Sequence, residues 1–561
     1  MKVTGAEIIV RTLIEQGVTD VFGYPGGQIL NVYDALYMHK DEINHVLTAH
    51  EQGASHAADG YSRVTGKVGV VIATSGPGAT NLVTGIATAM LDSIPMVAIT
   101  GNVPNSLIGK DSFQEIDITG VTLPITKHNF IVKKIEDLAD TIREAFQIAK
   151  SGRPGPVLVD VPKDIQIATY DYEPSPVVEK DPLPKASDAL INEAIALINE
   201  AKRPYIYIGG GGAGLGLGDE IMELADKIDA VIGCTFMGLS AIPNSCERFL
   251  GMQGMHGHYA SSVSQDEADL IIGVGVRFSD RATGNVAKYA KGAKIIQLDP
   301  DCSEINKNVK VDCGIVGDVE DSFMRIARGV AAASHPEWCE RVKELKALEC
   351  EFEKQIAERD KAALTPKMVL DVINKNKPPK TVIATDVGQH QMWTAQYAEF
   401  DCPRRIVSSG GLGTMGFGLG AAIGARVASG DTTVLITGDG SFGMNLNELA
   451  TAVASDIPVV IVVMNNGVLG MVRQWQTLFF GQRYSNTVLG ARKTDFVKLA
   501  EAFGAMGRRV TTKEELEVAF CEAVASGKTV VIDAIIDKDE FVLPMLPPGG
   551  SIEDIITVID K

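Results

Sequence analysis

The chain has 561 residues and a net charge of −19, because 52 lysines and arginines stand against 71 aspartates and glutamates. At roughly 100–200 residues per domain, this length predicts about three to five domains. Apolar residues make up 45% of the chain, enough for several packed cores, which excludes a disordered protein. The acidic balance repels phosphate backbones, so we expect no nucleic-acid partner.

The chain lacks the sequence signals of a membrane or secreted protein. Its longest apolar run, residues 457–464, is far shorter than the roughly 20 residues that a spanning helix needs. The opening residues, MKVTGAEIIV, show neither the apolar core nor the cleavage site of a signal peptide. Eight cysteines are scattered without any C-x-x-C pair, which favours free thiols in a reducing compartment. We therefore expect a cytoplasmic protein with no membrane segment.

The first unit, residues 1–167, alternates apolar strands with turns and helices. Its opening helix is predicted from the capping-box spacing of Thr4 and Glu7 and from Gly17, which suits a left-handed cap at the helix end. This alternation predicts a parallel sheet with helices on both faces. Strands are expected at residues 18–22, 68–73, 96–100 and 156–161.

A stretch rich in proline and charge, residues 168–190, is expected to be a linker. The second unit follows at residues 191–335, and four glycines, 209–212, come directly after its first strand. A charged helix with apolar residues at helical spacing is predicted over 340–361, within a helical connector assigned to 336–364. The strands expected in the second unit are 205–208, 270–276 and 294–298.

The third unit, residues 365–561, opens with Thr365 and Pro366, a favourable N-cap followed by proline in the first helical turn. Together the units predict an α/β protein with three doubly wound parallel-sheet domains. Whether the first and third units share a topology is left open, because no sequence identity between them is evident. The strands expected in the third unit are 381–385, 434–437, 458–464 and 530–534.

Two polar motifs in the third unit each follow an apolar strand. Gly438-Asp439-Gly440 comes after TVLIT, and Asn465-Asn466 comes after PVVIVVM, with residues 441–464 between the motifs. Both would lie on the carboxyl edge of a parallel sheet, where ligands bind. A carboxylate and an amide oxygen suit Mg²⁺, which usually also holds a phosphate group. A single Asp-Gly pair is more often a turn, but the complete pattern resembles the metal and diphosphate motif of thiamine-diphosphate enzymes.

That resemblance implies a ligand set for the third unit. Mg²⁺ would be held by Asp439, Asn466 and the backbone carbonyl of Val468. The glycines beside the aspartate would let backbone amides approach the phosphates. The remaining diphosphate contacts implied by the resemblance are Gln389, His390, Gly438, Gly440 and Ser441.

A thiamine enzyme also needs a carboxyl group that shares a proton with N1′ of the aminopyrimidine. Glu51, in HEQGASHAADGYSR of the first unit, fits that role, because the segment matches the pyrimidine-domain motif of this superfamily. Taken alone, Glu51 would be interpreted as an exposed surface residue. The spacing of Glu51 and His56 differs from the H-E-x-x-H of zinc hydrolases, which excludes that chemistry.

Further segments spread over the chain narrow the family. In their order they resemble the catalytic subunit of the acetohydroxyacid synthases, also called acetolactate synthases. The resemblance implies that pyruvate is decarboxylated on thiamine diphosphate and that its hydroxyethyl group joins a second 2-ketoacid. The products would be 2-acetolactate from pyruvate, or 2-aceto-2-hydroxybutyrate from 2-ketobutyrate, at the start of branched-chain amino-acid biosynthesis. The segments are FGYPGG at 22–27, TSGPGATN at 74–81, FQEIDITG at 113–120, RPGPVLVDVPKDIQ at 153–166, GMHG at 254–257, RFSDRATG at 277–284, GTMGFGLGAAIGA at 413–425 and GMVRQWQ at 470–476.

The same resemblance assigns the three units. Residues 1–167 would bind the cofactor's pyrimidine, residues 191–335 would be FAD-binding-like, and residues 365–561 would bind diphosphate and metal. Met415 would hold the cofactor in a bent shape, with core packing as the alternative. The Gly413 carbonyl would accept a hydrogen bond from the 4′-amino group.

Two residues resemble the family's acceptor site. Arg281 matches the arginine that binds the acceptor carboxylate, which a planar guanidinium can grip with two hydrogen bonds. Trp475 matches the tryptophan that favours the extra methyl group of 2-ketobutyrate, with an ordinary core aromatic as the alternative. Near the reacting carbon and the path of the substrate, the resemblance implies Gly27, Phe113, Gln114 and Lys163.

A flavin is expected in the middle unit. Gly209, Gly211 and Gly214 have the spacing of a dinucleotide fingerprint, but the next strand, ending near Thr235, offers no acid for a ribose, which disfavours a nicotinamide site. The biosynthetic branch of the family binds FAD without using it for net redox, and the catabolic branch lacks both FAD and an RFxDR-type signature. RFSDR at 277–281 therefore favours FAD. The residues that match its contacts are Arg153, Gly209, Gly210, Gly211, His256, Arg277, Asp299 and Asp318.

The resemblance also implies partners. Glu51 and the Asp439 motif would come from different subunits, so the active site would span the interface of a homodimer or of a dimer of dimers. A small regulatory subunit would be a separate chain. Two alternatives stay open: an FAD-independent catabolic acetolactate synthase, and a flavin-linked pyruvate oxidase whose FAD would turn over.

Overall fold

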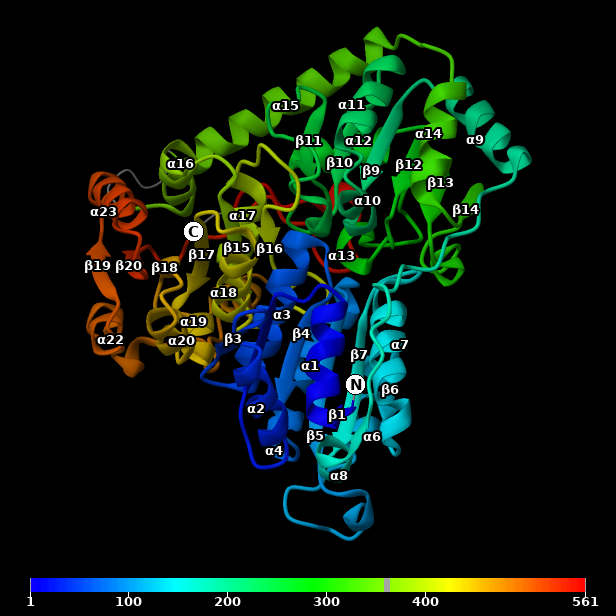
Figure 1. The fold of residues 1–561 in the computed structure, drawn as a ribbon. Coiled ribbons are helices and arrows are strands. Elements are labelled where there is room, and N and C mark those ends of the chain that lie inside the picture. The colour runs from blue at the N-terminus through cyan, green and yellow to red at the C-terminus, as the bar shows by residue number, and fades with distance from the viewer. Residues whose placement is uncertain (1, 358–363, 560–561) are drawn as a thin grey trace.

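Three parallel sheets of six strands each form the framework of the computed structural model, which describes residues 2–357 and 364–559. Helices cover both faces of each sheet, and the three domains lie against one another (Figure 1). The predicted α/β class with three doubly wound parallel-sheet domains is confirmed.

The N-terminal sheet has the strand order β3-β2-β4-β5-β7-β6. Its strand β4 has apolar residues on both faces: Val70 and Ile72 belong to one apolar cluster, and Val71 and Ala73 belong to another. Both faces are apolar because helices bury both. The strands are β2 (Asp20–Tyr24), β3 (Asn44–Leu47), β4 (Gly69–Ala73), β5 (Met96–Asn102), β6 (His128–Ile131) and β7 (Pro156–Pro162), and the helices are α1 (Gly5–Glu15), α2 (Leu30–Met38), α3 (Glu51–Thr65), α4 (Pro77–Asn81), α5 (Val83–Asp92), α6 (Ile118–Thr122), α7 (Leu138–Lys150) and α8 (Lys163–Ile167).

The central sheet has the order β11-β10-β9-β12-β13-β14, which is the doubly wound order of dinucleotide-binding domains. A long helix, α15, leads from this domain towards the C-terminal domain (Figure 1). The strands are β9 (Pro204–Ile208), β10 (Val231–Cys234), β11 (Phe249–Met252), β12 (Leu270–Val274), β13 (Lys294–Asp299) and β14 (Cys313–Val316), and the helices are α9 (Asp188–Glu200), α10 (Gly210–Leu215), α11 (Gly218–Lys227), α12 (Tyr259–Glu267), α13 (Asp280–Thr283), α14 (Val319–Gly329) and α15 (Pro336–Ala357).

The C-terminal sheet has the order β16-β15-β17-β18-β20-β19. Counted within each domain, the N-terminal and C-terminal sheets have the same order, 2-1-3-4-6-5, so these two domains share a topology. The strands are β15 (Val382–Thr385), β16 (Ile406–Val407), β17 (Thr433–Gly438), β18 (Val460–Asn465), β19 (Met506–Val510) and β20 (Val530–Ile535), and the helices are α16 (Pro366–Asn376), α17 (Gln389–Tyr397), α18 (Gly418–Ser429), α19 (Asp439–Asn445), α20 (Glu448–Ala454), α21 (Gly470–Phe479), α22 (Phe496–Ala502) and α23 (Lys513–Ser526).

The N-terminal and C-terminal domains share one apolar core, in which α3 packs against α18. The two helices approach closely because glycines lie at their contact. A Cβ atom added at Gly60 would lie 2.1 Å from the carbonyl oxygen of Ala421, and one added at Gly424 would lie 1.8 Å from that of Ala57. Alanine at either position would therefore push the two domains apart.

Some local expectations need correction. Thr4 accepts the backbone N–H of Glu7 as predicted, but the Glu7 carboxylate binds Arg11 and His39 instead of closing a capping box. The expected linker contains a short strand, β8 (Thr169–Asp171), which pairs antiparallel with β1 (Lys2–Thr4). The predicted 340–361 helix begins earlier, at Pro336, and its last part lies outside the described residues. Among the described residues, no helix is both long and apolar enough to cross a membrane.

Candidate functional site

Glu51 is the first residue of α3, just beyond the carboxyl end of β3. Only 9% of Glu51 is exposed, so it is not the exposed surface residue expected when this glutamate is considered without its motif. Asn81 donates a hydrogen bond from Nδ2 to Glu51 Oε2 over 2.9 Å. A Cβ atom at Gly78 would lie 3.2 Å from the other carboxylate oxygen, Oε1. The carboxyl group is thus held against α4, which contains both Gly78 and Asn81.

Two turns lie beside Glu51 at the same edge of the N-terminal sheet. The turn after β2 carries Gly27, whose carbonyl accepts a hydrogen bond from Lys163 Nζ over 3.0 Å. The turn after β4 contacts Gln114, because a Cβ atom at Gly76 would lie 3.0 Å from the Gln114 Cα. Phe113, 84% exposed, extends into solvent. The structure therefore brings the predicted Gly27, Glu51, Gln114 and Lys163 to one edge.

In the C-terminal domain, β17 ends at Gly438 and the helix α19 starts at Asp439, while Asn466 follows the neighbouring strand β18. The strands are paired so that Gly438 lies opposite Met464, which brings the two motifs together. Burial raises the pKa of Asp439 to about 6. The Asn466 side chain accepts the backbone N–H of Val468 over 3.2 Å. Within the described residues, no group of three or more His, Cys, Asp or Glu could hold a metal, which fits a site with one carboxylate.

Buried polar groups at the start of α17 surround the Gly438 turn. His390 is neutral, because burial lowers its pKa to about 3, and its Nε2 has no hydrogen-bond partner in the described part of the chain. A Cβ atom at Gly438 would lie 2.9 Å from His390 Nδ1. Gln389 donates to Gln474 Oε1 over 3.0 Å, and Ser441 donates to the Val387 carbonyl over 2.7 Å.

Met415 lies over the same turn, with its Cε atom 3.9 Å from the position of a Cβ atom at Gly440. It is half-buried at this edge, so its surroundings differ from those of a core methionine. The backbone beside it is fixed, because Gly416 donates to Asp386 Oδ1 over 2.7 Å. Asp386 is buried, and its pKa is raised to about 6. Gly413, two residues before Met415, has a φ of 70°, which favours glycine.

Trp475 lines a cavity of about 590 Å³ together with Met471, Val472 and Phe480 of the same segment. It is therefore not a core aromatic. Arg281 lies in α13 of the central domain with 64% of its side chain exposed, and its Nη1 donates to the sulfur of Met255 over 3.3 Å.

The C-terminal segment connects the surroundings of these two residues. Gln474, beside Trp475, donates to the Val542 carbonyl over 3.1 Å. Further along the segment, the backbone N–H of Leu546 donates to the Met255 carbonyl over 2.7 Å. The chain end thus ties the helix of Trp475 to the loop that contacts Arg281.

The predicted flavin contacts lie at the carboxyl edge of the central sheet. A Cβ atom at Gly209 would lie 2.0 Å from the Gly275 carbonyl oxygen, so the turns after β9 and β12 touch at the point where the strand order reverses. Gly210 and Gly211 continue the first of these turns, and Arg277 follows the second. His256 is buried with no partner for Nδ1 among the described residues.

Three acidic or basic residues complete this group, and each of them already has a protein partner. Asp299 ends β13 and has its pKa raised to about 6 by burial. Arg153 donates to Glu304 over 2.7 Å, and Asp318 caps α14.

The group around Glu51 and the group around Asp439 are built on different domains of the chain. No hydrogen bond or ion pair among the described residues joins them. Instead, Glu448 of α20 reaches the turn before Glu51, where its Oε2 accepts the backbone N–H of Ala49 over 3.1 Å. Burial raises the pKa of Glu448. No role was assigned to Asn81 or Glu448 from the sequence. Asn81 is the last residue of the TSGPGATN segment, and that position is the one sequence signal that could have indicated it.

Three models of protein families match the chain and define the class of enzyme to which it belongs. Residues 3–121 match the N-terminal TPP binding domain of thiamine pyrophosphate enzymes, residues 191–326 match the central domain and residues 386–534 match the C-terminal TPP binding domain. The protein is a thiamine-diphosphate-dependent enzyme.

Relatives matched over nearly their whole length narrow this class. A probable acetolactate synthase large subunit of Methanocaldococcus jannaschii is 46% identical, covering 99% of this chain and 95% of its own. The acetolactate synthase large subunit of Haemophilus influenzae is 43% identical (99% and 98%), and the isozyme 2 large subunit of Escherichia coli is 44% identical (98% and 98%). The chain belongs to the acetolactate synthase large-subunit family.

Proposed function

We propose that this chain is a biosynthetic acetolactate synthase, which joins pyruvate to a second 2-ketoacid with loss of CO₂. The observation that carries the proposal is the assembly of the family's motifs at the carboxyl edges of two sheets of the same topology, one bearing the buried Glu51 and the other bearing Asp439 and Asn466. Full-length identities of 42–46% to acetolactate synthase large subunits support the same reaction.

The cofactor and the chain would divide the work. Thiamine diphosphate, when bound, supplies a nucleophilic carbon and an electron sink. Glu51 would hold a proton at N1′ of the pyrimidine, with its carboxyl group oriented by the hydrogen bond from Asn81. The Gly413 carbonyl would accept a hydrogen bond from the 4′-amino group, and Met415 would pack against the cofactor.

The metal site fits Mg²⁺. Asp439 is a buried carboxylate with a raised pKa, and a bound cation would supply the missing positive charge. Asn466 Oδ1 and the Val468 carbonyl would complete the protein ligands, and the remaining ligands would be phosphate oxygens and water. The free Nε2 of buried His390 is available to a phosphate oxygen.

The central domain fits FAD. Its strand order, the contact of the Gly209 and Gly275 turns at the switch point, and the unpartnered Nδ1 of His256 all support a dinucleotide at this edge. The strand after the glycines, β10, offers no acidic residue for a ribose. Asp299, at the end of β13, would take that role. Binding through Arg153 would require it to leave Glu304.

The acceptor 2-ketoacid would be held by one residue of the central domain and one of the C-terminal domain. Arg281 is exposed, and its Nε lies 3.8 Å from Asp280 Oδ2. Its guanidinium would bind the acceptor's carboxylate. Trp475 would contact the acceptor's alkyl group in the cavity of α21. The active site would lie between the two subunits of a dimer, with Glu51 from one subunit and Asp439 from the other. The name "large subunit" of the relatives supports a separate small regulatory subunit as a partner.

Product formation from pyruvate tests the proposal. The purified chain would receive Mg²⁺ and thiamine diphosphate, with FAD added or omitted after stripping, and acetolactate would be measured as acetoin after acid treatment beside an unacidified control. We expect acetolactate that depends on all three additions. Dispensable FAD would favour a catabolic synthase, and bleaching of FAD by pyruvate without acetolactate would favour an oxidase.

We expect Trp475→Leu to keep acetolactate formation but to lose the preference for 2-ketobutyrate. One methyl group in an apolar pocket contributes discrimination of roughly 10–200-fold, so the loss should lie in that range. Competition between pyruvate and 2-ketobutyrate as acceptors measures it. Phe479→Leu is the matched control, because Phe479 packs on Trp475 with ring centroids 5.9 Å apart but does not line the cavity. An unchanged product ratio in Trp475→Leu would remove the assigned role.

A further inference from the structure

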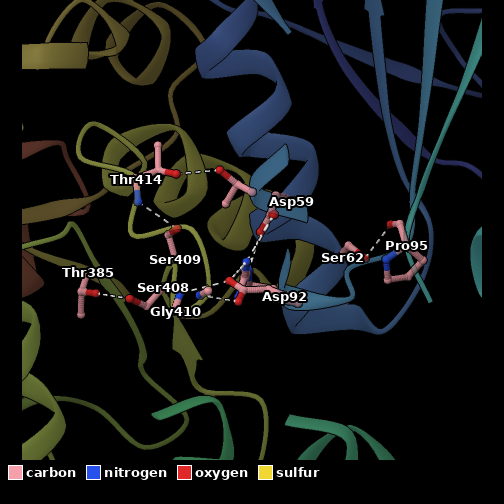
Figure 2. A network of polar contacts seen from close by, with 12 residues as sticks. Asp59, Ser62, Asp92, Pro95, Thr385, Ser408, Ser409, Gly410 and Thr414 are labelled. Atoms are coloured by element: carbon pink, nitrogen blue, oxygen red, sulfur yellow. Dashed lines mark hydrogen bonds and ion pairs between the residues drawn. The ribbon is translucent and has the colours of Figure 1, made fainter. Parts of the chain in front are cut away.

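The turn that carries Gly413 and Met415 is held by the N-terminal domain of the same chain. Asp92, the last residue of α5, accepts backbone hydrogen bonds from Gly410 over 3.0 Å and from Gly411 over 2.7 Å. Figure 2 shows Asp92 beside Gly410 in this network. A Cβ atom at Gly411 would lie 2.8 Å from Asp92 Oδ1, so the turn approaches the carboxylate as closely as its backbone permits.

The charge of Asp92 is balanced by Arg63 of α3. Arg63 Nη2 lies 2.8 Å from Asp92 Oδ2, and its Nε pairs with Asp59, one helical turn earlier. The two carboxylates are fully buried and the arginine side chain is 4% exposed. The Arg63 guanidinium also lies 5.3 Å from the ring centroid of Phe417, just beyond the turn.

A second contact holds the other end of the turn. Thr88 lies one helical turn before Asp92 on α5, and its hydroxyl is 2.8 Å from the hydroxyl of Thr414, the residue between Gly413 and Met415. Both threonines are buried. Residues four apart lie on the same face of a helix, so one face of α5 contacts the turn at two points, through Thr88 and Asp92.

Stability alone does not account for this arrangement. Desolvation of buried charges largely offsets their attraction, and apolar residues of similar volume often pack as well. A charged carboxylate does provide direction, since its charge-assisted hydrogen bonds to two adjacent N–H groups are stronger and geometrically stricter than neutral ones. Such precision matters where a backbone carbonyl and a side chain must meet a ligand.

We propose that Asp92, oriented by Arg63 and Asp59 and assisted by Thr88, is a positioning residue that sets the place of Gly413 and Met415. The proposal rests on the proposed function, from which the roles of these two residues come. It gives the N-terminal domain two tasks: it presents Glu51 to one active site, and it shapes the cofactor turn of its own chain.

Asp92→Asn tests the proposal, because it keeps the shape but removes the charge. Binding of thiamine diphosphate with Mg²⁺ is measured by calorimetry, and kcat and KM for pyruvate are measured at saturating cofactor. We expect the dissociation constant for thiamine diphosphate to rise roughly tenfold or more, as loss of charge-assisted hydrogen bonds implies, with little change in KM for pyruvate. Glu15→Gln is the matched control, since it breaks a part-buried pair with Arg143 in the same domain, remote from the turn.

A second pair of variants keeps the test decisive if Asp92→Asn fails to fold. Thr88→Val removes the hydroxyl contact and should weaken cofactor binding, whereas Thr88→Ser keeps the hydroxyl and should restore it. Variants that lower only the unfolding temperature, as is expected of Glu15→Gln, and bind the cofactor normally would overturn the positioning role. Absence of thiamine diphosphate binding by the unaltered protein would instead remove the proposed function and this inference with it.

Discussion

Replacing Glu51 by glutamine is expected to lower acetolactate formation by about 10²–10⁴-fold, the usual effect of losing a positioned acid–base group. Glutamine keeps the volume of the side chain and can still meet Asn81, but it cannot share a proton with N1′. Turnover is measured together with hydrogen–deuterium exchange at C2 of the bound cofactor. Exchange isolates the proton transfer from substrate binding.

Glu15→Gln again serves as the control for the loss of a carboxylate in the same domain. Cofactor binding measured by calorimetry should change little in Glu51→Gln, because the loss lies in proton transfer. Undiminished exchange at C2 in Glu51→Gln would refute the assignment of Glu51, even if turnover had fallen.

Mixing two inactive variants is expected to restore activity. Asp439→Ala removes the single carboxylate of the metal site. Loss of a residue that only supports a metal ligand lowers activity by roughly 10–100-fold, so loss of the ligand itself should lower it by at least as much. If each site takes Glu51 from one subunit and Asp439 from the other, a mixed dimer of Glu51→Gln and Asp439→Ala has one intact site. After subunit exchange, about a quarter of the wild-type activity should return in a closed twofold dimer.

The control for mixing is a chain that carries both substitutions, combined with either single variant. No pair of these chains can form an intact site, so no recovery is expected. Failure of the two single variants to complement, with subunit exchange verified by mass, would place the whole site within one chain. That outcome would contradict the arrangement between subunits.

The strands of the sheet interiors were predictable from local sequence. Val434–Thr437 and Lys294–Leu298 were expected and lie within β17 and β13, because strands buried on both faces are mostly apolar. Edge strands such as β16 and β19 were missed. β16 has two residues, and β19 includes Arg508 and Arg509, so neither has an apolar run to recognise.

Some residues of the site could not be found from sequence. Asp92 and Arg63 are 29 positions apart, and Glu448 is far along the chain from Ala49. No local period links such residues. Asp92 and Arg63 meet because α5 packs on α3, and Ala49 and Glu448 meet because the N-terminal and C-terminal domains share one core. The shared topology of the outer domains was also undetectable, because strand order depends on crossovers and not on residue identity.

The sequence by itself determined the fold class, the family and the chemical types at the site, because strand periodicity and short polar motifs after strands are local properties. Only the tertiary structure decided that Glu51 is buried against Asn81, that Trp475 lines a cavity, and that the Met415 turn is gripped by α5. The physical reason is that burial, charge pairing and close approach depend on segments that are distant in sequence and meet only when the domains pack together.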